Sequence, residues 1–86
     1  MRYLTQTYER LGIAYHSRAR LDELSLDYDR ARIDYEKAMV YYDLCIAQAQ
    51  VSPDLIVTQD IVDAHCRPYH QQVTERYQQL FAEGGS

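Results

Sequence analysis

The sequence is poor in the residues that interrupt helices. Glycine occurs at position 12 and then only at positions 84 and 85, and proline occurs only at positions 53 and 68. Because a helix interior tolerates glycine and proline least, their scarcity predicts long helices. A chain of 86 residues forms one small domain. We therefore expect an all-α domain over residues 1–86, with residues 84–86 as a flexible tail.

Cysteine and long apolar runs are also scarce. Cys45 and Cys66 are too few for a disulfide framework and form no C-x-x-C motif, so we expect two reduced thiols. No apolar run approaches the roughly 18 residues of a membrane span, and no charged-then-apolar leader indicates secretion. These absences predict a cytoplasmic protein without a membrane span.

Positive charge is in deficit as well. Nine Lys and Arg stand against thirteen Asp and Glu, which gives a net charge of −4. Aspartates flank the paired arginines at 18–20 and 30–32, and this excludes the clustered basic face that nucleic acid requires. The chain has nine tyrosines and no tryptophan. Tyrosine combines a large contact area with a polar tip, which suits a hydrated interface between helices.

The clearest helix boundary is VSPDLI, residues 51–56. Ser52 can cap a helix, Pro53 suits its first position, and Asp54 meets the positive end of its dipole. Val51 and Ile56 occupy the two positions of a hydrophobic staple. Downstream, apolar side chains recur at helical spacing; they are Val62, Cys66, Tyr69, Val73, Tyr77 and Leu80.

The most regular pattern is a heptad seam that alternates steps of three and four. Its members are Leu21, Leu24, Tyr28, Ala31, Tyr35, Ala38, Tyr42, Cys45 and Ala49. An earlier seam, at Leu4, Tyr8, Leu11 and Tyr15, is out of phase with it. The phase change indicates either a skip in one long helix or a turn between two helices, for which Ser25 and Asp27 are candidate caps.

We therefore predict three antiparallel helices near 3–24, 27–50 and 53–82. The alternative is one helix over residues 3–50, of about 72 Å at 1.5 Å per residue. Its seam would be too long for the remaining helix to cover, and the chain would form a homodimer.

The stretch HCRPYH, residues 65–70, is where side chains able to bind a metal or act as a nucleophile cluster. Cys66 and His70 share a helix face at a spacing that supplies two metal ligands, but no further ligand has a matching spacing, and no metal is expected. Cys66 then acts as a small apolar residue, and Arg67 pairs with Asp63 one turn back. Pro68 removes the hydrogen bond to the Ala64 carbonyl and predicts a kinked third helix, or two short helices that meet near Arg67.

Catalysis is not expected. His65 and Cys66 are adjacent and point about 100° apart on a helix, so the imidazole cannot activate the thiol. His16 and Ser17 fail for the same reason. No glycine-rich phosphate loop or HExxH motif is present, and no cofactor is expected.

Residues 27–46 resemble the second helix of an MIT domain, a three-helix module of trafficking proteins. The matching residues are Tyr28, Ala31, Tyr35, Ala38, Met39, Tyr41, Tyr42, Cys45 and Ile46. Tyr8, Leu11, Gly12 and Tyr15 resemble the first helix of a tetratricopeptide repeat. Residues 52–69 loosely resemble the Spo0E-type aspartyl-phosphate phosphatases, whose signature is degraded to QDIVD but retains Asp63.

The MIT resemblance implies a binding module that holds a partner helix or peptide between the second and third helices. We expect a non-catalytic protein-interaction module on an apolar Tyr/Ala-rich groove. The predicted partner-binding residues are Tyr35, Met39, Tyr42, Ile46, Val62, Cys66 and Tyr69. A self-assembling homo-oligomer is the alternative, and an aspartyl-phosphate phosphatase a minor one.

Overall fold

The computed structural model describes residues 2–51 and 56–82, which form three successive helices. The first is α1 (Arg2–Leu24) and the second is α2 (Tyr28–Val51). The third consists of α3 (Ile56–Ile61), a π-helical segment η1 (Val62–Cys66) and α4 (Arg67–Phe81). The prediction of an all-α bundle is confirmed. None of these described helices is long and apolar enough to cross a membrane.

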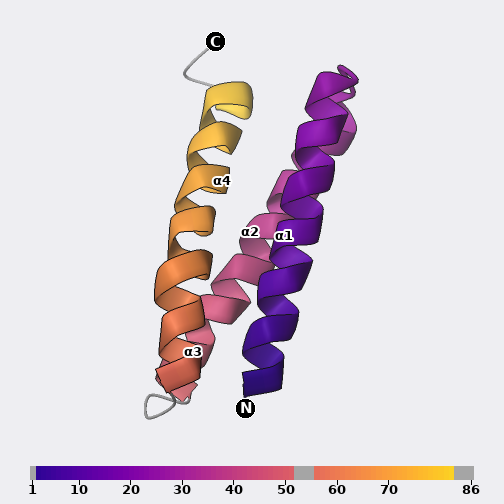
Figure 1. Cartoon of the computed structure of the whole chain (residues 1–86). Helices are drawn as coiled ribbons and strands as arrows, with labels where there is room; N and C mark the ends of the chain where they lie inside the picture. Colours follow the sequence, from indigo (N-terminus) through magenta and orange to yellow (C-terminus); the bar gives the residue numbers. More distant parts are fainter. Residues whose placement is uncertain (1, 52–55, 83–86) are drawn as a thin grey trace.

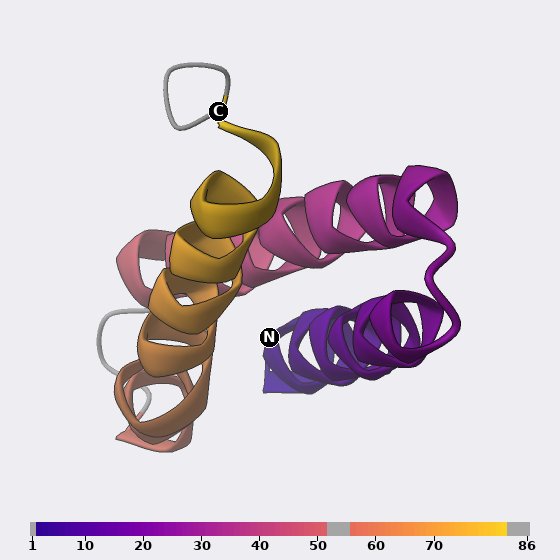
Figure 2. The ribbon, with the colours of Figure 1, turned by 90° about the horizontal axis from the view of Figure 1, so that it is seen from above.

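The three helices run up, down and up (Figure 1). α1 and α2 form a hairpin, and α4 packs against α2, so α2 lies behind α1 and α4 in that view. Seen from above, α1 and α2 run side by side from their connecting turn, and the third helix stands near the far end of α2 (Figure 2). The molecule is elongated, with extents of 43 × 23 × 15 Å.

A turn at Ser25–Asp27 separates α1 from α2, so the alternative of one helix over residues 3–50 is wrong. The Asp27 N–H donates to the Asp22 carbonyl and the Leu26 N–H donates to the Glu23 carbonyl, the pair of bonds that closes a helix in a Schellman motif. Leu26 takes the left-handed position, with φ 61°, where glycine is usual. The Asp27 carboxylate then accepts the Arg30 N–H at 3.2 Å and caps α2.

The inner face of α2 forms the core, as the seam predicts from Ala31 onward. Its members there are all buried: Ala31, Tyr35, Ala38, Tyr42, Cys45 and Ala49. Val62, Cys66 and Val73 meet them from the third helix. The earlier members of the seam lie outside the core, because Leu21 and Leu24 are 62% and 81% exposed beside the turn.

Gly12 allows α1 and α2 to approach closely. A Cβ atom at this position would lie 2.5 Å from the Cε1 atom of Tyr42, whose ring is fully buried. The absence of a side chain therefore makes room for the largest residue type of the core.

The third helix changes its hydrogen bonding just before Pro68. The Arg67 N–H donates to the Val62 carbonyl, five residues back, at the end of η1. Pro68 follows in the first turn of α4, where its missing N–H is tolerated. Two helical segments thus meet at Arg67, while the kink itself stays a prediction. The predicted cap at Ser52, Pro53 and Asp54 and the predicted tail at 84–86 lie outside the described residues.

Candidate functional site

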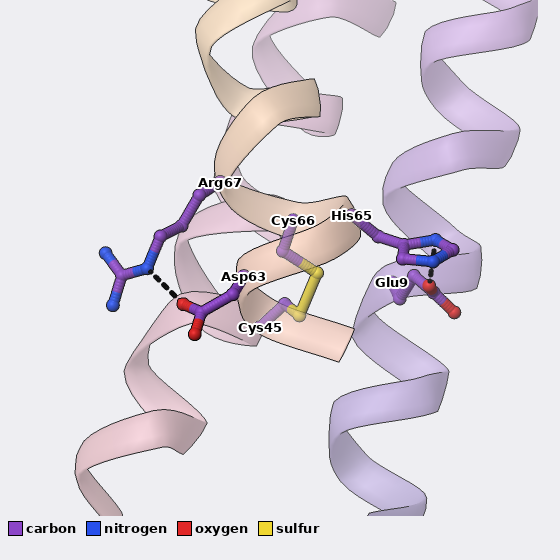
Figure 3. The surroundings of a disulfide bond; sticks show 6 residues. All are labelled: Glu9, Cys45, Asp63, His65, Cys66 and Arg67. Atoms are coloured by element: carbon purple, nitrogen blue, oxygen red, sulfur yellow. Dashed lines mark hydrogen bonds and ion pairs between the residues drawn. A yellow bond between two sulfur atoms is a disulfide. The ribbon is translucent and has the colours of Figure 1, made fainter. Parts of the chain in front are cut away.

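Cys45 and Cys66 form a disulfide, so the prediction of two reduced thiols is wrong (Figure 3). Cys45 lies on the inner face of α2 and Cys66 on the inward face of η1, and packing of these faces sets their Cα atoms 6.3 Å apart. Both residues are fully buried. The bond ties the third helix to α2, and Cys66 is neither a free apolar thiol nor a metal ligand.

The other side chains of HCRPYH hold the third helix to its neighbours. His65 Nδ1 lies 2.9 Å from Glu9 Oε2 of α1, and His70 Nε2 lies 2.8 Å from Asp43 Oδ1 of α2. The predicted pair between Arg67 and Asp63 is confirmed, at 3.1 Å (Figure 3). In the part of the chain that the structure describes, no group of three or more His, Cys, Asp or Glu residues is placed to hold a metal ion.

The predicted partner-binding residues lie in or against the core. Tyr35, Tyr42, Val62 and Cys66 are buried between α2 and its neighbours. The other three, Met39, Ile46 and Tyr69, are partly buried and pack against that core. Because α1 and the third helix already cover the inner face of α2, a partner reaches the four buried side chains only if the bundle opens.

A polar groove runs between α1 and α4. Two adjoining pockets of about 630 and 220 Å³ share His16, Arg20 and Gln72 in their linings. Glu23 lines the larger pocket, where its carboxylate accepts hydrogen bonds from Arg76 and from the Tyr35 hydroxyl. Burial opposes ionisation of Glu23, but these two donors lower its pKa. Burial and the hydrogen bond to Glu23 raise the pKa of Tyr35 to about 12.

His16 closes the inner end of this groove. Its Nδ1 lies 3.3 Å from the Tyr42 hydroxyl oxygen. Burial, and secondly the charge of Arg20, lower the pKa of His16, so the ring is neutral at pH 7. Burial also raises the pKa of Tyr42. Within the groove, Glu23 and Arg76 thus form an ion pair.

A second buried cluster joins α1 to α2 near the turn. Arg18 donates two hydrogen bonds, of 2.9 and 3.0 Å, to the carboxylate of the buried Asp34. These bonds lower the pKa of Asp34. Asp22 is buried beside it, and a hydrogen bond to Asp34 raises the pKa of Asp22. The two carboxyl groups thus hold one proton between them more readily than isolated carboxyl groups do.

The exposed surface of α2 carries a second apolar seam, which the sequence analysis missed. Positions 33, 37, 40, 44, 47 and 51 alternate steps of four and three, and all but Lys37 are aliphatic. We call these aliphatic residues, Ile33, Val40, Leu44, Ala47 and Val51, the outer stripe. All five are exposed, and the four larger residues range from 39% at Leu44 to 70% at Val51. The signal was available in the sequence, since Val40 and Leu44 fall outside the inner seam.

A shallow pocket of about 450 Å³ lies over the first half of the outer stripe. Ile33, Val40 and Leu44 line it together with Tyr15 and Tyr41. The two tyrosine rings stack with centroids 5.5 Å apart and planes 3° from parallel. The stacked rings line the pocket on the side of the stripe that faces α1.

Comparison of the chain with known proteins finds no matching family model, no similar curated protein and no similar solved structure.

Proposed function

We propose that this chain is a non-catalytic protein-interaction module that binds a helical segment of a partner on the outer stripe of α2. The observation that carries the proposal is the exposure of five aliphatic side chains at heptad spacing on one helix. A contiguous apolar surface of this kind is typical of an interaction site, whereas scattered single apolar residues are not. The heptad spacing suits an amphipathic helix, which offers its own seam at the same interval.

The binding face of this proposal differs from the face predicted from the sequence. The inner Tyr/Ala seam of α2 is covered by the chain's own helices, whereas the residues of the outer stripe are exposed beside Tyr15 of α1. The resemblance of residues 27–46 to an MIT domain stays a prediction, and the proposal rests on the outer stripe alone.

Affinity in the micromolar range is expected. Each half-exposed aliphatic side chain that a partner covers contributes about 1 kcal/mol, and the cost of association offsets much of the sum. The pocket beside Tyr15 and Tyr41 accepts a branched aliphatic side chain of the partner and sets its position along the stripe.

The test is a titration of the chain against a fluorescent amphipathic peptide with a leucine seam and uncharged borders. Anisotropy should report binding to the native chain and at least roughly tenfold weaker binding to Val40→Gln/Leu44→Gln, because two apolar contacts are lost. Ile13→Gln, which changes an exposed aliphatic residue of α1, is the control and should bind as the native chain does. Equal binding by the stripe variant contradicts the proposal.

A further inference from the structure

The groove between α1 and α4 contains an arginine that is not paired. Arg20 is exposed and lines both pockets of the groove, and its guanidinium group makes no hydrogen bond or ion pair with the residues that the structure describes. The other guanidinium group of the groove, that of Arg76, donates to Glu23 and Gln79. The donors of Arg20 are therefore free to bind a ligand.

Two positive charges and one negative charge line the groove, so one positive charge is in excess. Arg20 and Arg76 are positive, Glu23 is negative, and His16 is neutral at pH 7. The side chain of Glu23 is only 13% exposed and accepts hydrogen bonds from Arg76 and Tyr35, so its charge is compensated. Because the chain as a whole carries a charge of −4, the groove is a locally positive site on an acidic protein.

The larger pocket of the groove also has an apolar end beside the turn between α1 and α2. Leu24 and Tyr28 line this pocket, and they are 81% and 46% exposed. Both belong to the heptad seam of the sequence, but the described helices leave them outside the core. An apolar ligand body that covers them is removed from water together with both side chains. The volume of about 630 Å³ lies within the range of about 300–1,000 Å³ that is usual for small-molecule sites.

We propose that this groove binds a small monocarboxylate with an aromatic or aliphatic body. The carboxylate accepts two hydrogen bonds from the guanidinium group of Arg20, and the body lies toward Leu24 and Tyr28 in the larger pocket. The side-chain amide of Gln72, which lines both pockets, donates a further hydrogen bond. A phosphate ester fits less well, because its second negative charge exceeds the single positive excess. The site shares no lining residue with the pocket over the outer stripe, so this inference does not depend on the proposed helix binding.

The experiment is an NMR titration of the isotope-labelled native chain with 3-phenylpropionate and with 3-phenylpropionamide, its neutral analogue of the same shape. Binding in the millimolar range is expected for a ligand of this size. The acid should bind at least about tenfold tighter than the amide, because only the acid offers a carboxylate to Arg20. The largest shifts of backbone amide signals should fall in residues 16–24 and 72–76, and those of residues 33–51 should stay small.

Arg20→Gln should bind the acid at least about tenfold weaker than the native chain does, with an unchanged Tm because Arg20 has no partner to lose. Arg10→Gln is the matched control: it removes the same charge from an exposed position of α1 that lines neither pocket, and it should bind as the native chain does. Equal binding of the acid and the amide, an equal loss in both arginine variants, or shifts centred on residues 33–51 would overturn the proposal. Absence of binding by the native chain up to about 10 mM acid would overturn it as well.

Discussion

At the residue scale, Gly12 and Tyr42 are a matched pair on facing helices. The tyrosine ring is fully buried, with His16 and Tyr69 beside it, and it fills the space that the absent side chain of Gly12 leaves. A glycine within a helix is unfavourable by about 1 kcal/mol relative to alanine. The close packing of Tyr42 offsets that cost. Packing between α1 and α2 therefore explains why position 12 is a glycine.

Gly12→Ala should therefore destabilise the domain by about 1 kcal/mol, because the clash with the enclosed Tyr42 ring outweighs the gain in helix propensity. Urea unfolding followed by circular dichroism measures the change. Ser17→Ala, at an exposed position of the same helix, is the control and should change the free energy of unfolding by less than about 0.5 kcal/mol. A Gly12→Ala variant as stable as the native domain would show that Tyr42 is free to move.

The carboxyl pair of Asp22 and Asp34 predicts a pH-dependent stability. The folded pKa of Asp34 is lowered by Arg18, so its stabilising contribution is present above the unfolded value near 4 and is lost as pH falls through the folded pKa. The folded pKa of Asp22 is raised, so its contribution falls as pH rises from about 4 through the folded pKa. At neutral pH the ionised Asp22 is therefore a source of instability.

Asp22→Asn should raise the Tm at pH 7, because the amide donates a hydrogen bond to Asp34 without adding a charge. The gain should vanish near pH 3, where Asp22 is protonated in both states. Thermal unfolding from pH 3 to 8 tests this, with the exposed Asp60→Asn as the control. A lower Tm of the Asp22 variant at pH 7 would contradict the shared-proton arrangement.

At the element scale, a disulfide and several polar contacts attach the third helix to the hairpin of α1 and α2. The Cys45–Cys66 disulfide joins η1 to α2, His65 contacts Glu9, and Arg76 bonds to Glu23. The disulfide closes a loop of 21 residues. Because such a cross-link restricts the unfolded chain, it contributes to the stability of the whole bundle.

Reduction of the disulfide should lower the free energy of unfolding by about 3 kcal/mol for a loop of this length. Urea unfolding of the native chain with and without dithiothreitol measures this difference. Cys45→Ala/Cys66→Ala should be less stable than the oxidised chain and insensitive to the reductant. A native chain whose unfolding midpoint is unchanged by dithiothreitol would show that the bond contributes nothing to stability.

At the scale of the whole molecule, α1 and the third helix cannot cover α2 on all sides. A folded chain of 10.1 kDa is expected to expose about 5,300 Å², whereas this one exposes 5764 Å². The inner face of α2 is buried by α1 and the third helix, and no further described element remains to cover the outer stripe. The exposed stripe thus follows from the arrangement of the described helices.

The inner seam of α2 is buried by helices of the same chain, which predicts that the isolated chain is a monomer. Light scattering across a dilution series should give a molar mass near 10.1 kDa at low micromolar concentration. The control is Val40→Gln/Leu44→Gln, in which the outer stripe is less apolar, and it should give the same molar mass. A doubled mass of the native chain that persists on dilution would contradict the prediction.

How much of this protein could be predicted from its sequence differs between the fold and the site. The inner seam from Ala31 to Ala49 and the apolar face of the third helix were predicted from periodicity, because apolar residues that recur at helical spacing share one face of a helix. The all-α class followed from the scarcity of glycine and proline. Ser25 and Asp27 were both candidate caps of the second helix. A turn between two helices was one of two alternatives for the phase change, the other being a skip in one long helix.

Other features depended on distances that no local pattern contains. Periodicity places Cys45 and Cys66 on inward faces, but only the packing of α2 against η1 brings their sulfur atoms together. Likewise, both seams of α2 are visible in the sequence, yet nothing in it says which of them the chain covers. The sequence by itself determined the helices and their apolar faces, because these depend on neighbouring residues. The tertiary structure alone decided the disulfide, the carboxyl pair and the exposed outer stripe, because each depends on which helices meet.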